Sequence, residues 1–81
     1  MMWFVYILKS IKYNWIYVGM TQNVEKRLFL HNSQKVNSSK AKAPLKLLYF
    51  EEVSSSEEAR KLEKYYKTNA GKEFLKRRKI I

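Results

Sequence analysis

Two runs rich in aromatic and β-branched residues, separated by a short polar break, constrain the fold of this chain more than any other feature. The runs are Trp3–Lys9 and Trp15–Met20, and their composition predicts two β-strands. Both faces of the first strand are apolar, which predicts burial on both sides. The break, Ser10–Asn14, is so short that the two strands should form an antiparallel hairpin.

The pairing register of this hairpin decides where its tyrosines lie. A turn centred on Ile11 and Lys12 places Tyr6 directly opposite Tyr17, so that the two phenols share one face of the sheet. Because neighbouring residues of a strand face opposite sides, a register slip of one residue would separate them.

A glycine and a capping residue follow the second strand. Gly19 lets backbone or ligand approach closely where the strand ends. Asn23 can cap a helix that we expect over about Gln22–Asn32. The sequence therefore predicts a strand, a tight connection and a helix in immediate succession.

Two polar residues interrupt the inward face of that helix. Val24, Leu28 and His31 follow the i, i+4, i+7 spacing of a buried stripe, and Arg27 lies on the same stripe. Arginine is seldom fully buried unless it is paired, so we expect Arg27 to face a cleft. The alternative is that Arg27 and His31 lie at the rim of the stripe and reach water or a helix-end carbonyl.

The second half of the chain adds a loop, a strand and a longer helix. The loop, Ser33–Pro44, contains no acidic residue, and we expect it to be solvated and mobile. Lys46–Val53 is the third strand, which we expect to pair with the first because a helix separates it from the second. Ser55 and Glu58 have capping-box spacing at the start of a helix that runs to about Thr68.

A break and a short basic helix complete the set of elements. Asn69–Gly71 should end the longer helix, and a last helical piece follows over Glu73–Lys79. Its run of four basic residues is expected to face water. With 81 residues, the sequence predicts one small domain over residues 1–81. The fold class is α+β, a three-stranded antiparallel sheet flanked by about three helices.

A carboxylate lies on the inward stripe of the longer helix. Glu63 falls among Ala59, Leu62 and Tyr66, where a carboxylate must be paired or must bind a cation. Three cations are candidates for an ion pair instead of a metal: Arg27, Arg60 and Lys67.

The charge of the chain indicates its class of partner. Seventeen Lys and Arg against seven acidic residues give a formal net charge of +10, which points to a polyanion, most often nucleic acid. The basic residues are spread along the chain rather than gathered on one amphipathic helix, so we expect no membrane partner. The candidates for contact with the nucleic acid are Gly19, Lys35, Lys40 and Lys42.

The residue types that are missing exclude several kinds of site. Cysteine is absent, which excludes disulfides, thiolate metal sites and cysteine nucleophiles, and it fits a cytoplasmic location. All seven acids are Glu, so a metal site must use Glu, backbone, water or the phosphates of a substrate. The apolar run Trp3–Leu8 is too short for a signal peptide, and no stretch approaches the ~18 apolar residues of a membrane span.

Taken together, the polar residues of these elements suit phosphodiester hydrolysis. Glu63 can hold a divalent cation beside phosphate oxygens, and Arg27 can offset the charge that builds on the phosphoryl group. A phenol near a cation and a guanidinium should lose its proton more readily, so Tyr6 or Tyr17 can act as general base. His31 could relay that proton or hydrogen-bond the phosphate.

The order and spacing of these residues resemble the GIY-YIG nuclease superfamily, in particular its small stand-alone bacterial members related to the nuclease domain of the excinuclease C subunit. The resemblance covers Trp3 to about Leu75. It is carried by Phe4-Val5-Tyr6, Tyr17-Val18-Gly19, Arg27, His31 and Glu63.

This resemblance implies a sheet of three antiparallel strands, a DNA substrate and a connection with DNA repair. It also implies a role for each site residue. One of Tyr6 and Tyr17 is the general base, Arg27 stabilises the transition state, and Glu63 binds one divalent metal. That metal is usually magnesium, with manganese as the alternative.

The chain departs from the family pattern at three positions. Phe4 occupies the glycine position of the first motif, and Met20 stands where the excinuclease-type domains carry a lysine. Asn69 is too close to Glu63 to be the downstream asparagine of the family. We expect no second domain that recognises a sequence or a lesion.

Three functions are compatible with these features. The first is a metal-dependent DNA endonuclease, and the second is a nucleic-acid-binding module on the same scaffold that hydrolyses nothing alone. The third, a structural basic protein such as a ribosome-associated factor, explains the charge but leaves Glu63 and Arg27 without a role. The oligomeric state is open.

Overall fold

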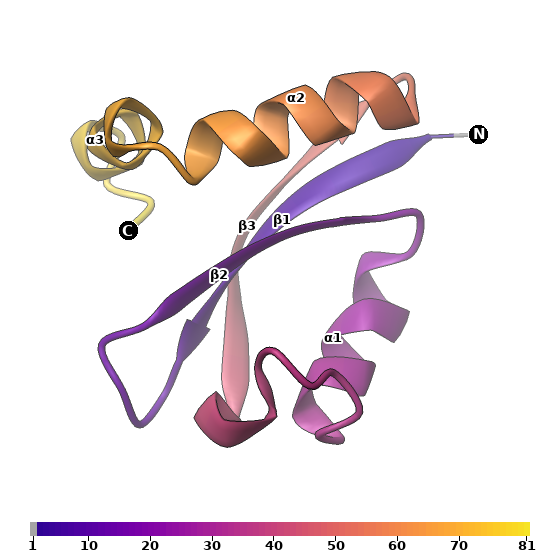
Figure 1. The fold of residues 1–81 in the computed structure, drawn as a ribbon, viewed down its shortest axis with the longest axis vertical. Helices are drawn as coiled ribbons and strands as arrows, with labels where there is room; N and C mark the ends of the chain where they lie inside the picture. Colours follow the sequence, from indigo (N-terminus) through magenta and orange to yellow (C-terminus); the bar gives the residue numbers. More distant parts are fainter. Residues whose placement is uncertain (1) are drawn as a thin grey trace.

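The computed structural model describes residues 2–81 and folds them around a single small sheet (Figure 1). The elements follow in the order β1 (Trp3–Ser10), β2 (Ile16–Thr21), α1 (Val24–Asn32), the 3-10 helix η1 (Lys40–Lys42), β3 (Leu45–Val53), α2 (Ser56–Tyr66) and α3 (Asn69–Arg77). Three antiparallel strands with helices on their faces confirm the predicted α+β fold.

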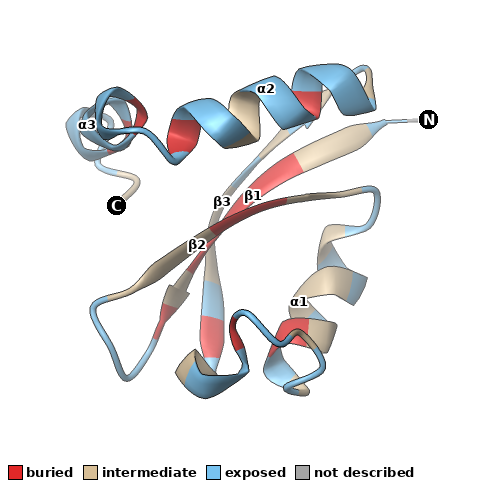
Figure 2. Cartoon of the chain, viewed as in Figure 1, coloured by how far each residue is buried: buried red, intermediate tan, exposed pale blue. Residues whose placement is uncertain are grey.

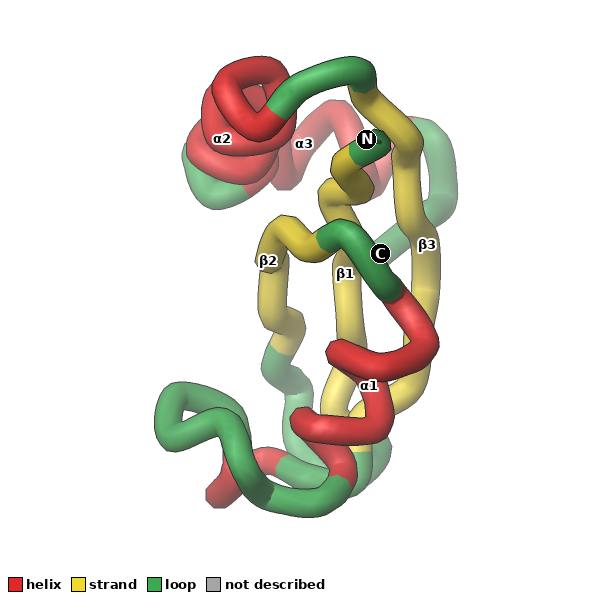
Figure 3. The backbone as a smooth tube through the Cα atoms, turned by 90° about the vertical axis from the view of Figure 1, so that its right-hand side faces the viewer, coloured by secondary structure: helices red, strands yellow, loops and turns green. Residues whose placement is uncertain are grey.

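The sheet has the strand order β2-β1-β3, and Figure 3 shows β1 between its two neighbours. Both pairings are antiparallel, so the predicted partnership of the third strand with the first is confirmed. As the central strand, β1 is the most deeply buried element of the sheet, as Figure 2 shows. The outer edge of β2 has no strand beside it among the residues described.

Two apolar clusters cover the two faces of the sheet. Val5 and Ile7 of β1 pack with Ala59 and Tyr66 of α2 and with Leu75 of α3. Side chains on the opposite face of β1 pack against Leu28 of α1 and Leu45 of β3. The sheet therefore separates a layer formed by α2 and α3 from a layer formed by α1.

The register of the hairpin differs from the prediction by two residues. Tyr6 pairs with Gly19, and Tyr17 pairs with Leu8, so the expectation that the two tyrosines lie directly opposite is wrong. Because a shift of two residues preserves the face, the rings still lie on the same side, with centroids 6.1 Å apart.

Ser10 explains the shift, because its side chain stabilises a longer turn than expected. Its Oγ accepts hydrogen bonds from the backbone N–H groups of Lys12 and Tyr13, at 3.3 and 3.1 Å. The backbone N–H of Ser10 donates to the carbonyl of Trp15, which closes the turn. The last paired residues are consequently Lys9 and Ile16.

The break between the last two helices also lies earlier than predicted. We expected Asn69–Gly71 to interrupt the helix, but these residues form the first turn of α3. The helix α2 ends at Tyr66, and Thr68 caps α3 by accepting a hydrogen bond from the N–H of Gly71. A Cβ at position 71 would collide with the backbone carbonyl of Tyr65, so the glycine allows the close packing of α3 against the end of α2.

The stretch 33–44, predicted to be a solvated and mobile loop, is largely exposed but contains a short helix and one buried serine. It contains η1, and Ser39 is only 1% exposed. Ser10 Oγ donates to the carbonyl of Lys42, which fastens the stretch to the turn between β1 and β2. No helix among residues 2–81 is long and apolar enough to cross a membrane.

Candidate active site

The face of the sheet beneath α1 carries a buried tyrosine that organises the candidate site. Tyr6 is 1% exposed and lies opposite Gly19 on β2. A Cβ at position 19 would lie 2.5 Å from the phenolic oxygen of Tyr6 and 2.6 Å from its Cζ. Only glycine leaves room for this ring, so Gly19, predicted to contact nucleic acid, is buried and serves to place Tyr6.

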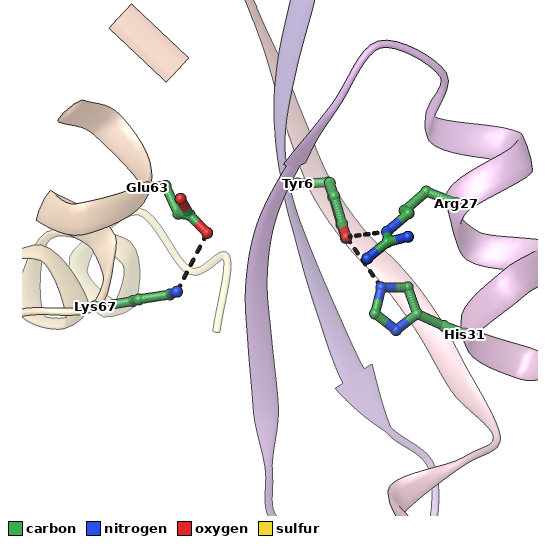
Figure 4. Close-up of polar contacts among 5 residues, drawn as sticks. All are labelled: Tyr6, Arg27, His31, Glu63 and Lys67. Carbon is green, nitrogen blue, oxygen red and sulfur yellow. Dashed lines mark hydrogen bonds and ion pairs between the residues drawn. The ribbon is translucent and has the colours of Figure 1, made fainter. Parts of the chain in front are cut away.

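A chain of hydrogen bonds runs through the phenol of Tyr6 (Figure 4). The Nε of Arg27 donates to the Tyr6 oxygen over a long 3.4 Å, and the same oxygen lies 3.0 Å from Nε2 of His31. The Nδ1 of His31 lies 2.6 Å from Oγ of Ser39. One strand, one helix and a loop residue thus meet at one point.

The directions of these hydrogen bonds follow from the chemistry of arginine. A guanidinium only donates, so the Tyr6 oxygen accepts from Arg27, and its own proton has Nε2 of His31 as one acceptor within reach. A neutral imidazole that accepts at Nε2 carries its proton on Nδ1, and that proton is donated to Ser39. His31 is therefore arranged as an acceptor for the proton of Tyr6.

Burial dominates the protonation of these groups. It raises the pKa of Tyr6 to about 12, against the opposing effect of the Arg27 hydrogen bond. Burial, followed by the charge of Arg27, lowers the pKa of His31 to about 4. Both groups are neutral at pH 7: Arg27 does lower the pKa of the Tyr6 phenol, as expected, but burial raises it by more.

Tyr17 completes the aromatic wall of the site. Its ring centroid lies 4.7 Å from that of His31 in an edge-on arrangement, and it stacks on Trp15 at 6.1 Å. Tyr17 is half-buried, whereas Tyr6 is fully enclosed. Arg27 is also half-buried, and its Nε bonds the Tyr6 oxygen rather than a helix-end carbonyl, whereas its position at a cleft stays a prediction.

Glu63 lies apart from these four residues. Figure 4 shows Glu63 and Lys67 on one side of the strand that leads into α1, and Tyr6, Arg27 and His31 on the other. The Glu63 carboxylate forms an ion pair with Lys67, 3.2 Å away and one helical turn along α2. The structure thus brings four of the five predicted residues together, and Glu63 has one of the three partners expected for an ion pair.

The donor set fits a metal ion only if a substrate contributes to it. No group of three or more His or carboxylate side chains that could hold a metal occurs among residues 2–81. Glu63 Oε2 bonds Lys67, and the side chain is 20% exposed, so Oε1 is available as one oxygen ligand. Phosphate oxygens and water would have to supply the others, as the shortage of acids already indicated.

The three predicted loop lysines lie outside the buried site. Lys35 and Lys40 are exposed, and Nζ of Lys42 lies 4.7 Å from the ring centroid of Tyr13. Ser39, which the sequence analysis missed, lies beside them in the chain but points inward to His31. The available signal was indirect, since a histidine on a buried face needs a partner for each ring nitrogen.

Comparisons with known proteins show the family of this chain. The sequence model of the GIY-YIG catalytic domain matches residues 2–78. A UPF0213 protein of Staphylococcus haemolyticus is 40% identical over 74 residues, which cover 90% of this chain and 89% of that protein. A UPF0213 protein of Clostridium perfringens is 40% identical over 65 residues, covering 79% and 69% of the two chains. The solution NMR structure of a UPF0213 protein from Bacillus halodurans superposes on this chain with a TM-score of 0.55 at 31% sequence identity. The match covers 93% of this chain and 82% of that protein.

Proposed function

This chain belongs to the GIY-YIG family, and from that premise we propose that it is a metal-dependent endonuclease that hydrolyses phosphodiester bonds in DNA. The observation that supports the proposal most strongly is the buried chain of hydrogen bonds from Arg27 through Tyr6 to His31. A guanidinium, a phenol and a neutral imidazole in series supply charge stabilisation, a base and a proton acceptor.

Each side chain has a distinct part in this proposal. Arg27 turns from its long contact with Tyr6 toward the scissile phosphate and offsets the charge that develops there. Tyr6 then passes its proton to Nε2 of His31, and its phenolate accepts a proton from the attacking water. Incoming phosphate charge would raise the pKa of His31, because it counters the effect of Arg27 on the imidazole.

Glu63 is the proposed metal ligand. A magnesium or manganese ion bound there would supply positive charge beside the non-bridging phosphate oxygens. Within the protein, Oε1 of Glu63 is the proposed ligand atom, because the ion pair with Lys67 occupies Oε2.

A second candidate function is nucleic-acid binding without hydrolysis by the isolated chain. The observation that favours it is the same ion pair, which leaves Glu63 engaged with Lys67 and without contact to the Tyr6 site. This candidate predicts tight binding of DNA but no cleavage with either metal.

Nicking of supercoiled plasmid separates the two candidates. With magnesium or manganese, the parent should nick the plasmid, and Glu63→Gln should slow nicking on the order of 10³-fold through loss of the metal. Glu73→Gln is the matched control, since Glu73 is an exposed carboxylate on α3 and should be replaceable without effect. Equal nicking by the parent and Glu63→Gln would refute the proposed metal site, and absence of nicking by a folded, DNA-binding parent would favour the second candidate.

A further inference from the structure

Two adjoining hollows lie along the outer edge of β2, on the face of the sheet that α3 covers. The larger has a volume of about 350 Å³, and Lys9, Lys72 and Lys76 contribute to its wall. The smaller, about 180 Å³, is lined in part by Lys67 and Lys72. Because both hollows share Ile16 and Lys72, they form one continuous groove, which we call the β2 groove.

The β2 groove is basic and has no carboxylate side chain in its lining. Lys9 also pairs directly with Lys46 across β1 and β3, an arrangement of like charges that destabilises a sheet. The pair between Lys67 and Glu63 is the only ion pair within residues 2–81, so Lys9, Lys72 and Lys76 form no direct ion pair, although Ile81, the last residue of the sequence, also lines the larger hollow. This concentration of uncompensated charge is explained if an anion occupies the groove.

The position of the groove indicates which anion. Its smaller part reaches Tyr17 of the candidate site and Lys67, whose Nζ is bound to Glu63. Its larger part extends away from them toward the turn that joins β1 and β2, where Asn14 lies. A linear polyanion that lies along the groove would therefore contact successive lysines between the turn and Lys67, the partner of Glu63.

We propose that the β2 groove binds the sugar-phosphate backbone of the nucleic-acid strand that flanks the cleaved phosphate. This inference rests on the proposed nuclease function, because only a nuclease has a cleaved phosphate. The choice of a nucleic-acid backbone as the bound group rests on the complementarity between its negative charge and the lysines of the groove. It assigns substrate binding to Lys9, Lys67, Lys72 and Lys76 rather than to the lysines of the loop Ser33–Pro44. It also gives Lys67 a second partner, because a phosphate in the groove competes with Glu63 for the same ammonium group.

The salt dependence of DNA binding tests this assignment. The probe is a fluorescently labelled oligonucleotide of 20 nucleotides, single-stranded or in a duplex, measured by anisotropy in EDTA over a series of NaCl concentrations. Each lost phosphate contact reduces the slope of log affinity against log salt by ~0.7–0.9, so the triple variant with Lys9, Lys72 and Lys76 replaced by Ala should lower the slope by about 2. The matched triple variant with Lys35, Lys40 and Lys42 replaced by Ala removes the same charge and should lower it by less than about 1.

Two further arms keep the test decisive. Lys72→Ala with Lys76→Ala changes only exposed residues of α3, so it should fold and should lower the slope by about 1.5 even if the triple variant does not fold. An equal or larger reduction by the loop variant would overturn the assignment. So would a groove variant that loses binding to vesicles containing phosphatidylserine while its oligonucleotide slope stays at the parental value.

Because EDTA prevents cleavage, this result is independent of the nicking assay. A reduced slope in the groove variant together with absence of nicking would support nucleic-acid binding in the groove and refute the proposed nuclease function. An unchanged slope together with normal nicking would retain the nuclease and refute the groove.

Discussion

Around the phenolic oxygen of Tyr6, burial and a neighbouring positive charge act on the pKa in opposite directions, and burial prevails. The same burial keeps His31 neutral, with its acceptor nitrogen aimed at the phenol. On the other side of the imidazole ring, Ser39 Oγ lies 2.6 Å from Nδ1 and gives this nitrogen a buried hydrogen-bond partner. Both ring nitrogens of His31 therefore have a partner within the protein.

Replacement of Ser39 by Ala should change which ring nitrogen of His31 carries the proton. The buried Nδ1–H loses its acceptor, so we expect a loss of about 1–3 kcal/mol in the free energy of unfolding and a population with the proton on Nε2. His31 is the only histidine in the sequence, so its ¹⁵N NMR signals report both ring nitrogens without overlap. Ser38→Ala at an exposed position is the control, and an unchanged tautomer in Ser39→Ala would show that Ser39 does not position His31.

The same NMR titration defines a pH dependence of stability. The pKa of His31 should be about 4 in the folded parent, against ~6.5 in the unfolded chain. Between these values the unfolded chain binds the additional proton, so the free energy of unfolding falls as the pH is lowered from about 6.5 to about 4. Urea titrations of the parent and His31→Gln across this range should show a steeper fall in the parent.

At the scale of elements, the close pairing of β1 with β2 creates the site. Tyr6 can lie over β2 only because Gly19 has no side chain, and α1 then adds Arg27 and His31 from above the same face. The register shift of two residues leaves this geometry intact, since it preserves the face on which Tyr6 and Tyr17 lie. A glycine directly opposite a tyrosine is therefore a structural requirement of the strand pair.

Gly19→Ala should strain this pairing. The new methyl group would meet the ring of Tyr6 at 2.5–3.0 Å, and the forced shift should cost about 1–3 kcal/mol, measured by urea denaturation. In a Tyr6→Leu background the ring atoms are gone, so the additional cost of Gly19→Ala should become much smaller. Equal costs in both backgrounds would mean that the Tyr6 ring is not what excludes a side chain at position 19.

At the scale of the whole molecule, local patterns predicted the elements and long-range contacts decided the site. The aromatic runs predicted the β1–β2 hairpin, and helical spacing placed Arg27 and His31 on the face that meets Tyr6. Ser39 could not be predicted, because it reaches His31 from a stretch without periodicity. The partner of Glu63 and the course of the β2 groove likewise depend on how α2 and α3 pack on the sheet.

The exact ends of elements were also set by single side-chain contacts. Ser10 lengthens the hairpin turn by accepting two backbone hydrogen bonds. Thr68 caps α3, so that this helix begins at Asn69, where the sequence predicted the start of a break. Propensity alone favours neither outcome, since serine, threonine and asparagine suit both turns and helix caps. The errors therefore concern boundaries and register, whereas the number and order of the strands were predicted correctly.

The most direct test of the central claim is the single-turnover rate of DNA cleavage by Tyr6→Phe, with the binding of the same DNA measured in parallel. This change keeps the ring over Gly19 but removes the oxygen that joins Arg27 to His31. If Tyr6 is the general base, the cleavage rate should fall by ~100-fold or more while the affinity for DNA stays within about twofold. A parental cleavage rate in Tyr6→Phe would contradict the assignment of the active site to the hydrogen-bonded chain beneath α1.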